Sequence, residues 1–373
     1  MPAITFNIKE NELEVRQQDP YHRGLNWRQR FNVMVCGERD SSFEVNLTDS
    51  LLHTKLPFQV TMVLPNTDGR GYGTFILDDL TLTYLLKNWQ TIVDDIARQS
   101  LLMTLYENYL GKRFSADAWA ESLLKGLPLE NNPLIASTVV SYLTGVMYRV
   151  SSSIKEKLEH DIYALAHNHK LPSCRLQLMR GFMRIATSGS MVKQLYTLWE
   201  QQSDTGLSER DYTALCYELA IRLPDKSKQL LDTQRERISD PDRLRQFDFV
   251  SRAVVADTLQ LDSLFAGLLQ AENRQMEPWA SAALSYLNHP LRTERAVKYI
   301  YLGLSELENV QRTGDIFFPK AWASALLGNH RSSEAYEELV RFLNGHPGYS
   351  ALLKNKIMQA AYPLWRENIG SVE

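Results

Sequence analysis

The feature that most constrains the fold of this chain is a change in the spacing of its apolar residues near residue 80. Before this point, apolar and polar residues alternate, as in strands that bury one face. After it, apolar residues recur at helical spacing, and no convincing strand follows between Leu80 and Glu373. The chain is therefore predicted to be mainly α-helical with a small all-β domain, at residues 80–373 and 1–79 respectively.

The first 79 residues contain short alternating runs with polar connections between them. The segment Asn66 to Gly69 is a turn signal, because Asn and Asp side chains bond to nearby backbone and Gly accepts positive φ. About six or seven strands of this kind favour a small β-sandwich. The runs predicted as strands are Ile4 to Ile8, Leu13 to Val15, Phe31 to Val35, Phe43 to Leu47, Phe58 to Met62 and Tyr72 to Leu77.

The rest of the chain consists of amphipathic pieces of roughly 10 to 18 residues, the usual length of globular helices. The first apolar stripe of helical spacing extends from Leu82 to Ile96. Because paired short helices stack in one direction, we predict a HEAT-like α-helical superhelical array, without a strict sequence repeat. Several expected helix starts carry capping side chains. These are Ser208 with Asp211, Asp240-Pro241, Thr293-Glu294 and Ser332-Ser333-Glu334.

The charge balance excludes partners that require strong positive charge. The formal net charge is -3 and the pI is about 6.3, so nothing attracts a nucleic acid or an anionic membrane surface. The most apolar long segment, Pro133 to Tyr148, is shorter than the roughly 20 residues that span a membrane. We therefore expect no nucleic-acid partner and no membrane span.

The histidines do not have the spacing of a metal site. His160, His167 and His169 form one cluster, but His167 and His169 are two residues apart and point about 200° away from each other on a helix. No third ligand has a sensible spacing from the other two. We expect polar helix surface at these positions and assign no metal ligand.

The cysteines and glycines have simpler structural interpretations. Cys36, Cys174 and Cys216 are widely spaced, as expected of small buried hydrophobic residues. Gly69, Gly71 and Gly73 lie in a predicted hairpin, not between a strand and a helix, so they are expected in a tight turn and not in a dinucleotide site.

The remaining candidates for chemistry are also better explained by structure, so no catalytic or cofactor-binding residue is assigned. Ser188-Gly189-Ser190 lacks the strand that precedes a serine nucleophile. The acidic pairs Asp78-Asp79 and Asp94-Asp95 suit a helix junction or a solvated face better than general acid catalysis. Two aromatic clusters are expected in the core, with a cavity wall as the alternative. They are Phe317-Phe318-Pro319 with Trp322, and Tyr299 with Tyr301.

Three segments resemble the zinc aminopeptidases of the aminopeptidase N type, bacterial branch. Leu64 to Phe75, LPNTDGRGYGTF, is similar to the end of the family's small β-sandwich. Asn66, Gly71 and Tyr72 match the family pattern there, whereas Gly73-Thr74 replaces the usual Tyr-Arg.

The other two segments lie in the helical part of the chain. Asp94 to Leu110 looks like an early helix of the family's helical domain. Arg312 to Trp322, preceded by Glu277-Pro278-Trp279 and Asn288-His289-Pro290, resembles the family's C-terminal helical domain. The resemblance therefore extends over nearly the whole chain.

Two motifs of that family are missing, and their absence decides what the resemblance implies. The zinc-binding His-Glu-x-x-His helix and the Gly-Ala-Met-Glu-Asn substrate strand occur nowhere in the sequence. The chain therefore resembles the C-terminal region of such a zinc metallopeptidase, with the catalytic domain absent. The resemblance implies that the sandwich is a spacer and that the helical domain encloses the substrate chamber.

The resemblance also implies the partners and the cofactor. The partners would be the chain's own catalytic domain and a peptide substrate, and zinc would belong to the missing domain. This chain alone is expected to bind no cofactor and to be inactive. Because Met1 is followed directly by a predicted strand, the chain is interpreted as cut from a longer protein.

Two alternatives stay open. The first is a stand-alone helical-repeat scaffold that binds a protein partner without chemistry. The second is a hydrolase whose site is assembled from dispersed residues. The reading frame upstream of Met1 separates the first alternative from the aminopeptidase hypothesis. Both a cytoplasmic and a periplasmic location fit the sequence.

Overall fold

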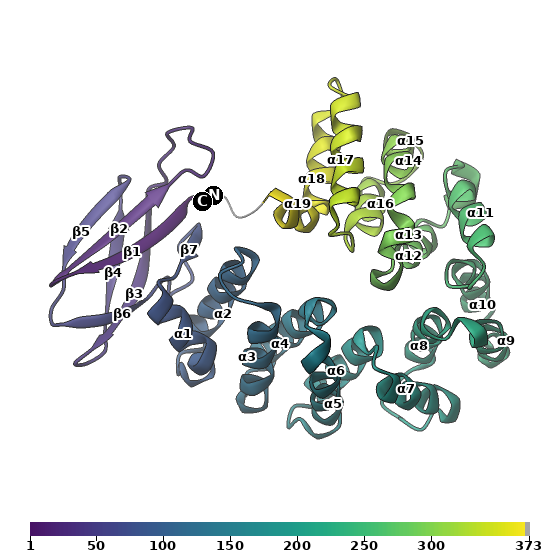
Figure 1. Ribbon diagram of the computed structural model, residues 1–373, viewed down its shortest axis with the longest axis horizontal. Coiled ribbons are helices and arrows are strands. Elements are labelled where there is room, and N and C mark those ends of the chain that lie inside the picture. The colour runs from purple at the N-terminus through teal and green to yellow at the C-terminus, as the bar shows by residue number, and fades with distance from the viewer. Residues whose placement is uncertain (370–373) are drawn as a thin grey trace. The chain divides into compact units, whose positions relative to one another are not determined.

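The computed structural model describes residues 1–369, in which strands come first and helices follow (Figure 1). The predicted fold class, mainly α with a small all-β domain, is confirmed. The chain divides into two compact units, and among the described residues the first comprises residues 1–185 and the second residues 186–369. The sandwich and the first six α-helices thus share one unit, and the predicted division at residue 79 stays a prediction.

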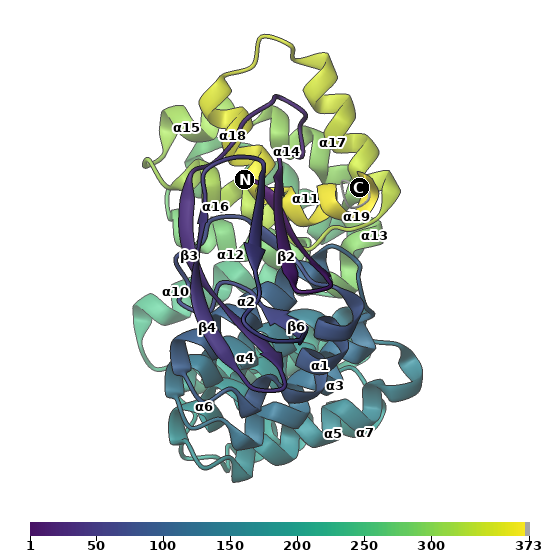
Figure 2. The same cartoon turned by 90° about the vertical axis from the view of Figure 1, so that its left-hand side faces the viewer.

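The strands form two sheets with the orders β5-β2-β1-β7 and β4-β3-β6. Their inward faces share one core, in which Ile4 and Phe75 of the first sheet meet Phe31 of the second, with the Phe31 and Phe75 ring centroids 5.2 Å apart. The strands therefore make a β-sandwich, seen from its side in Figure 2. Their bounds are Ala3–Lys9 (β1), Glu12–Gln18 (β2), Gln29–Gly37 (β3), Ser41–Leu47 (β4), Leu51–Lys55 (β5), Val60–Leu64 (β6) and Thr74–Ile76 (β7).

One strand and several strand ends differ from the prediction. β5 was missed because it is an edge strand that pairs with β2 alone, and its side chains are exposed or half-buried without a buried face. Phe58 precedes β6, Tyr72 precedes β7 and Leu77 follows β7, so none of the three belongs to a strand. Tyr72 instead lies in the loop before β7 and is exposed.

Helices of the first unit pack in two layers, because α3 contacts α1 and α5 whereas α4 contacts α2 and α6. This alternation is the paired-helix arrangement that the short amphipathic pieces predicted. The bounds are Asp79–Asn88 (α1), Asp95–Leu110 (α2), Ala116–Gly126 (α3), Pro133–Val146 (α4), Ser152–Asn168 (α5) and Pro172–Ile185 (α6).

Helices are the regular secondary structure in the described residues of the second unit. Within it, the apolar core of residues 253–364 lies between α12, α16 and α18 on one side and α14, α17 and α19 on the other. Its helices are Gly189–Gln201 (α7), Glu209–Arg222 (α8), Ser227–Arg237 (α9), Pro241–Val250 (α10), Thr258–Leu268 (α11), Glu277–Leu287 (α12), Thr293–Ala296 (α13), Ile300–Ser305 (α14), Leu307–Thr313 (α15), Phe318–Leu327 (α16), Ser333–Gly345 (α17), Ala351–Ala360 (α18) and Tyr362–Ile369 (α19).

The predicted apolar stripe from Leu82 to Ile96 is not one helix. α1 ends at Asn88, a short 3₁₀ turn follows, and α2 begins at Asp95. The side chain of Asp94 accepts a hydrogen bond from the Ala97 N–H and so caps the new helix. A capping aspartate inside an apolar stripe therefore outweighs the periodicity, and Ile96 is left exposed.

Three of the four predicted caps are confirmed. Ser208 and Asp211 form a reciprocal capping box, Asp240 caps α10 ahead of Pro241, and Ser332 accepts from the Ala335 N–H. The prediction at Thr293 is wrong, because a 3₁₀ turn leads directly into α13 and no side chain caps it.

A buried asparagine joins the sandwich to α2. Asn108 donates from Nδ2 to the Phe75 carbonyl at 2.8 Å and accepts from the Leu77 N–H at 3.1 Å, so its amide replaces the strand that β7 lacks at the sheet edge. Ser100 adds a second bond, from its Oγ to the Asn66 carbonyl at 2.5 Å. These bonds fix the direction of α2 relative to the last strand.

We predict that Asn108→Ala lowers the free energy of unfolding of the first unit by about 2–4 kcal/mol, because it leaves two backbone groups of the β7 edge buried and unpaired. Urea unfolding followed by circular dichroism measures the change. Asn88→Ala is the matched control: Asn88 donates to the carbonyl four residues earlier, as Asn108 also does, but bonds to no strand. The control should cost about 0.5 kcal/mol or less. An equal loss of unfolding free energy in the two variants would show that Asn108 does not join the sandwich to α2.

Candidate functional site

The histidines of the sequence cluster have different surroundings in the structure. Among residues 1–369, no group of three or more His, Cys, Asp and Glu side chains is placed to hold a metal ion. His167 is exposed on α5, with Nδ1 2.9 Å from the Tyr163 carbonyl. His169 was expected on a polar surface, and this was wrong: it is buried, with Nε2 3.0 Å from the Leu127 carbonyl.

His169 is one of three buried histidines that follow a helix and bond to an earlier helical turn. His289 bonds through Nε2 to Glu218 at 3.2 Å, and His330 bonds through Nε2 to Asn288 at 2.8 Å. The bonds of His169 and His330 each connect residues 42 positions apart. Each of these two bonds therefore ties the end of one helix to an earlier part of the same unit.

The other candidates from the sequence also have structural roles. Cys174 and Cys216 are buried, and burial raises the pKa of the Cys174 thiol to about 11 and that of Cys216 to about 12. Both thiols are therefore protonated and unreactive at neutral pH. Asp78 and Asp94 cap α1 and α2.

The aromatic clusters are mostly core, as expected. Phe318, Trp322 and Tyr299 are buried, and Tyr301 is half-buried against that core. Phe317 differs, since 76% of its surface is exposed. Its place at the last position before α16 turns it out of the apolar face that Phe318 and Trp322 share.

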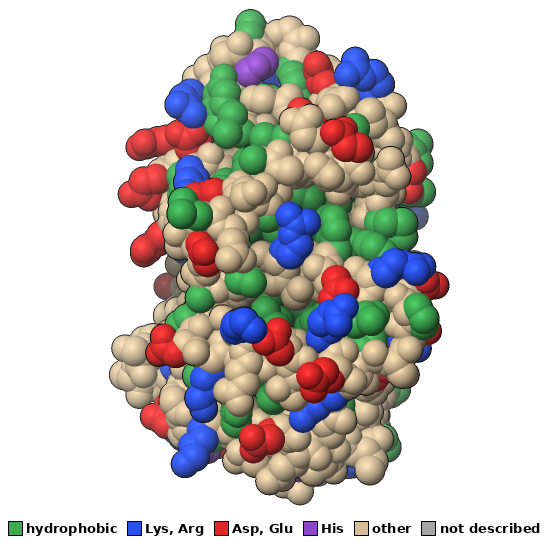
Figure 3. All heavy atoms as spheres, turned by 90° about the vertical axis from the view of Figure 1, so that its right-hand side faces the viewer, with side chains coloured by type: hydrophobic (Ala, Val, Ile, Leu, Met, Phe, Trp, Pro, Cys, Tyr) green, Lys and Arg blue, Asp and Glu red, His purple; other side chains and the backbone are tan. Residues whose placement is uncertain are grey.

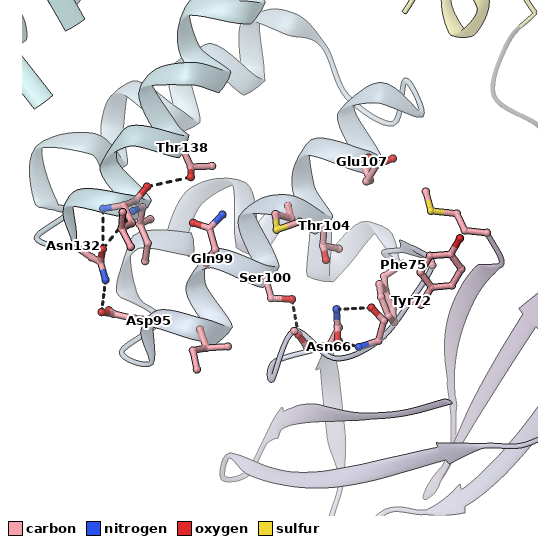
Figure 4. Close-up of a pocket in the computed structure, with 18 residues that line it drawn as sticks. Asn66, Tyr72, Phe75, Asp95, Gln99, Ser100, Thr104, Glu107, Asn132 and Thr138 are labelled. Carbon is pink, nitrogen blue, oxygen red and sulfur yellow. Dashed lines mark hydrogen bonds between the residues drawn. The ribbon is translucent and has the colours of Figure 1, made fainter. Parts of the chain in front are cut away.

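A cavity of about 740 Å³ lies along α2, in the first unit. One wall is the loop from Asn66 to Phe75, the second is the start of α4 from Asn132 to Thr138, and α2 itself forms the floor (Figure 4). We call this cavity the α2 groove. It lies next to the joint made by Asn108.

The loop wall is held by Asn66, a residue that the sequence marked only as a turn. Asn66 adopts the left-handed conformation (φ 51°), and its Oδ1 accepts from the Gly71 N–H at 2.6 Å. A Cβ at Gly71 would lie 2.5 Å from Cζ of Phe75, so only glycine fits there. Asn66 and Gly71 thus shape this wall of the groove.

The end of the groove near Asp95 is governed by one buried guanidinium. Arg98 donates to both carboxylate oxygens of Glu130, at 2.7 and 3.0 Å, and also to Asp95. Glu130 is buried, whereas 55% of the Asp95 side chain is exposed toward solvent. Hydrogen bonds from Asn132 and Arg98 hold the pKa of the Asp95 carboxyl below its ordinary value. Two carboxylates around one cation leave this end negatively charged at neutral pH.

Sequence reasoning missed the α2 groove for a physical reason. α2 buries Leu101, Leu102 and Leu105 on one side but also carries Ile96 and Met103 on another, where both are exposed. When apolar residues lie on two faces of a helix, the sequence no longer shows a single apolar face. The signal that could have revealed the groove is the pair Ile96 and Met103, seven residues apart on a face that the core does not use.

No protein-family model matches the sequence, and no curated protein matches it. Within the described residues, every helix falls short of the length and apolar content needed to cross a membrane. Acidic and basic side chains are interspersed on the face of the molecule in Figure 3, in keeping with the net charge of -3.

Buried His330 makes the stability of the second unit dependent on pH. Asn288 donates its amide to the Leu284 carbonyl, so its Oδ1 accepts from Nε2 of His330. Nδ1 of His330 has no hydrogen-bond partner among the described residues. Burial, with a smaller effect of the Arg331 charge, lowers the pKa of His330 to about 4.

Because the folded-state pKa lies below the unfolded value, the unfolded chain binds the proton first, and the stabilisation is lost as pH falls through about 6.5 toward 4. We predict that the free energy of unfolding drops by about 2 kcal/mol between pH 7 and pH 5 through this residue alone. Urea unfolding of the wild type and of His330→Gln at both pH values isolates the effect. An NMR titration in which the His330 ring takes up a proton near pH 6.5 would contradict it.

Proposed function

We propose that this chain is the non-catalytic C-terminal part of a zinc aminopeptidase of the aminopeptidase N type. In this proposal the sandwich is a spacer, and the helical part encloses the chamber in which amino acids are removed from the amino terminus of a peptide. The zinc ion and the groups that activate water belong to a catalytic domain outside this chain.

One observation supports the proposal above the others. Two of the segments that resemble the family, Leu64 to Phe75 and Asp94 to Leu110, pack against each other through the bonds of Ser100 to Asn66 and of Asn108 to Phe75. A spacer that is bonded to the first long helix holds both parts in one orientation. Such rigidity is what a chamber wall requires, because small misplacements of a bound substrate reduce the rate of a reaction strongly.

A stand-alone scaffold is the second candidate function. The α2 groove supports it, because a preformed cavity with apolar and polar lining is where helical proteins bind partners. The two candidates differ in what is encoded ahead of Met1. The aminopeptidase proposal requires a His-Glu-x-x-His segment in the same reading frame, and the scaffold does not.

We predict that the purified chain holds no stoichiometric zinc and does not hydrolyse amino-acid anilides, because its sequence has no His-Glu-x-x-His motif. Elemental analysis after dialysis against zinc, together with an anilide assay, measures both properties. The genomic reading frame upstream of Met1 is the companion measurement. Zinc-dependent turnover by the chain alone, or an upstream sequence without the zinc motif, would overturn the proposal.

A further inference from the structure

The α2 groove has the length of a short extended peptide. Asp95 and Glu107 line it from positions 12 residues apart on one helix. At a rise of 1.5 Å per residue they are separated by about 18 Å. An extended chain covers that distance in about five residues at roughly 3.3 Å each.

Apolar side chains line the groove although solvent reaches them. Ile96, Met103 and Leu134 are 61%, 54% and 78% exposed, and all three belong to the same cavity. Single exposed apolar residues are ordinary, but several around one concavity are typical of a binding surface. Met103 is unbranched and can adjust to different apolar partners.

The negative charge at the Asp95 end of the groove favours a basic partner. The lining of the groove includes the carboxylates of Asp95 and Glu107 and the amino-terminal residue Met1, but no lysine, arginine or histidine. The nearest buried cation, Arg98, already bonds to Glu130 and Asp95. Oδ1 of Asp95 accepts a hydrogen bond from Arg98, and Oδ2 accepts one from Asn132. Because the carboxylate is partly exposed, it can accept a further hydrogen bond from a ligand.

We propose that the α2 groove binds an extended, apolar peptide segment of about five residues that ends in a lysine or arginine, with the basic side chain at Asp95 and the apolar side chains against Ile96, Met103 and Leu134. This inference does not depend on the proposed function, because the groove would bind such a segment in an enzyme fragment or in a scaffold. Failure of the aminopeptidase proposal would leave it intact.

Fluorescence anisotropy with a labelled probe peptide tests the inference. The probe is an acetylated, amidated Leu-Val-Phe-Leu-Lys sequence, and the matched peptide replaces its lysine with glutamate. We expect saturable binding of the basic probe, at least about tenfold weaker binding of the acidic one, and weaker binding of the basic probe at high salt.

Leu134→Ser should weaken binding of the basic probe about tenfold, because a largely exposed leucine is covered only in the complex. Leu259→Ser is a close control. Leu259 is 77% exposed, and like Leu134 it is the second residue of its helix. In both leucines the backbone N–H donates to the side chain that caps the helix. The control variant should bind as the wild type does.

Asp95→Asn should weaken binding of the basic probe about three- to fivefold and should reduce its preference over the acidic peptide. Asp242→Asn is the control, because Asp242 also lies in the first turn of a helix and pairs with an arginine three residues later. Both positions are largely exposed, so both variants should fold, which circular dichroism checks.

Three results would overturn the inference. They are no saturable binding of the basic probe, equal binding of the two peptides, and equal effects of the groove variants and their controls. Sedimentation velocity tests for a different occupant of the groove. A dimer that becomes monomeric in Leu134→Ser would show that a second copy of the chain, and not a peptide, fills the groove.

Discussion

The side-chain amide of Asn108 is the interaction on which the first unit depends. It bonds to the Phe75 carbonyl of β7 and to the Leu77 N–H just after this strand, at the edge where β7 has no neighbouring strand. An unpaired buried edge would cost the free energy of its unmade hydrogen bonds. Asn108 removes that cost and also sets the position of α2, so the sandwich and α2 have a fixed orientation relative to each other.

The α2 groove is a consequence of that joint. Its floor is α2, and its loop wall is fixed by the bonds of Asn66 to Gly71 and of Ser100 to Asn66. At its other side, Arg98 ties the start of α2 to Glu130, just before α4. A site whose walls are hydrogen-bonded before a ligand arrives loses less entropy on binding, which favours a preformed peptide site over a surface that must reorganise.

The sequence was informative where one physical signal dominated. Alternation found the strands around Ile4, Val15 and Phe31, because each has one buried face, and capping chemistry found the helix starts at Ser208 and Asp240. It failed where two requirements compete. β5 is an edge strand without a buried face, and the stripe through Leu82 is cut by a cap at Asp94.

The α2 groove and the buried histidines could not be predicted from local pattern, since both arise from contacts between residues far apart in the chain. Asn108 and Phe75 are 33 positions apart, and His330 and Asn288 are 42 apart. From the sequence alone, a polar residue on a helix is expected to be exposed, because its hydrogen-bond partner lies far away in the chain. The family resemblance pointed to Asn66 and Gly71, but their part in a cavity wall follows only from the fold.

Amide hydrogen exchange at Leu77 tests the central claim most directly, because its N–H bonds to the side chain of Asn108 and to no strand. If the sandwich and α2 form one cooperative unit, this amide exchanges with the same free energy of opening as the core amides of β3 and of α2. Exchange of Leu77 at a much lower free energy, while those core amides stay protected, would show that the joint opens by itself and would contradict the account.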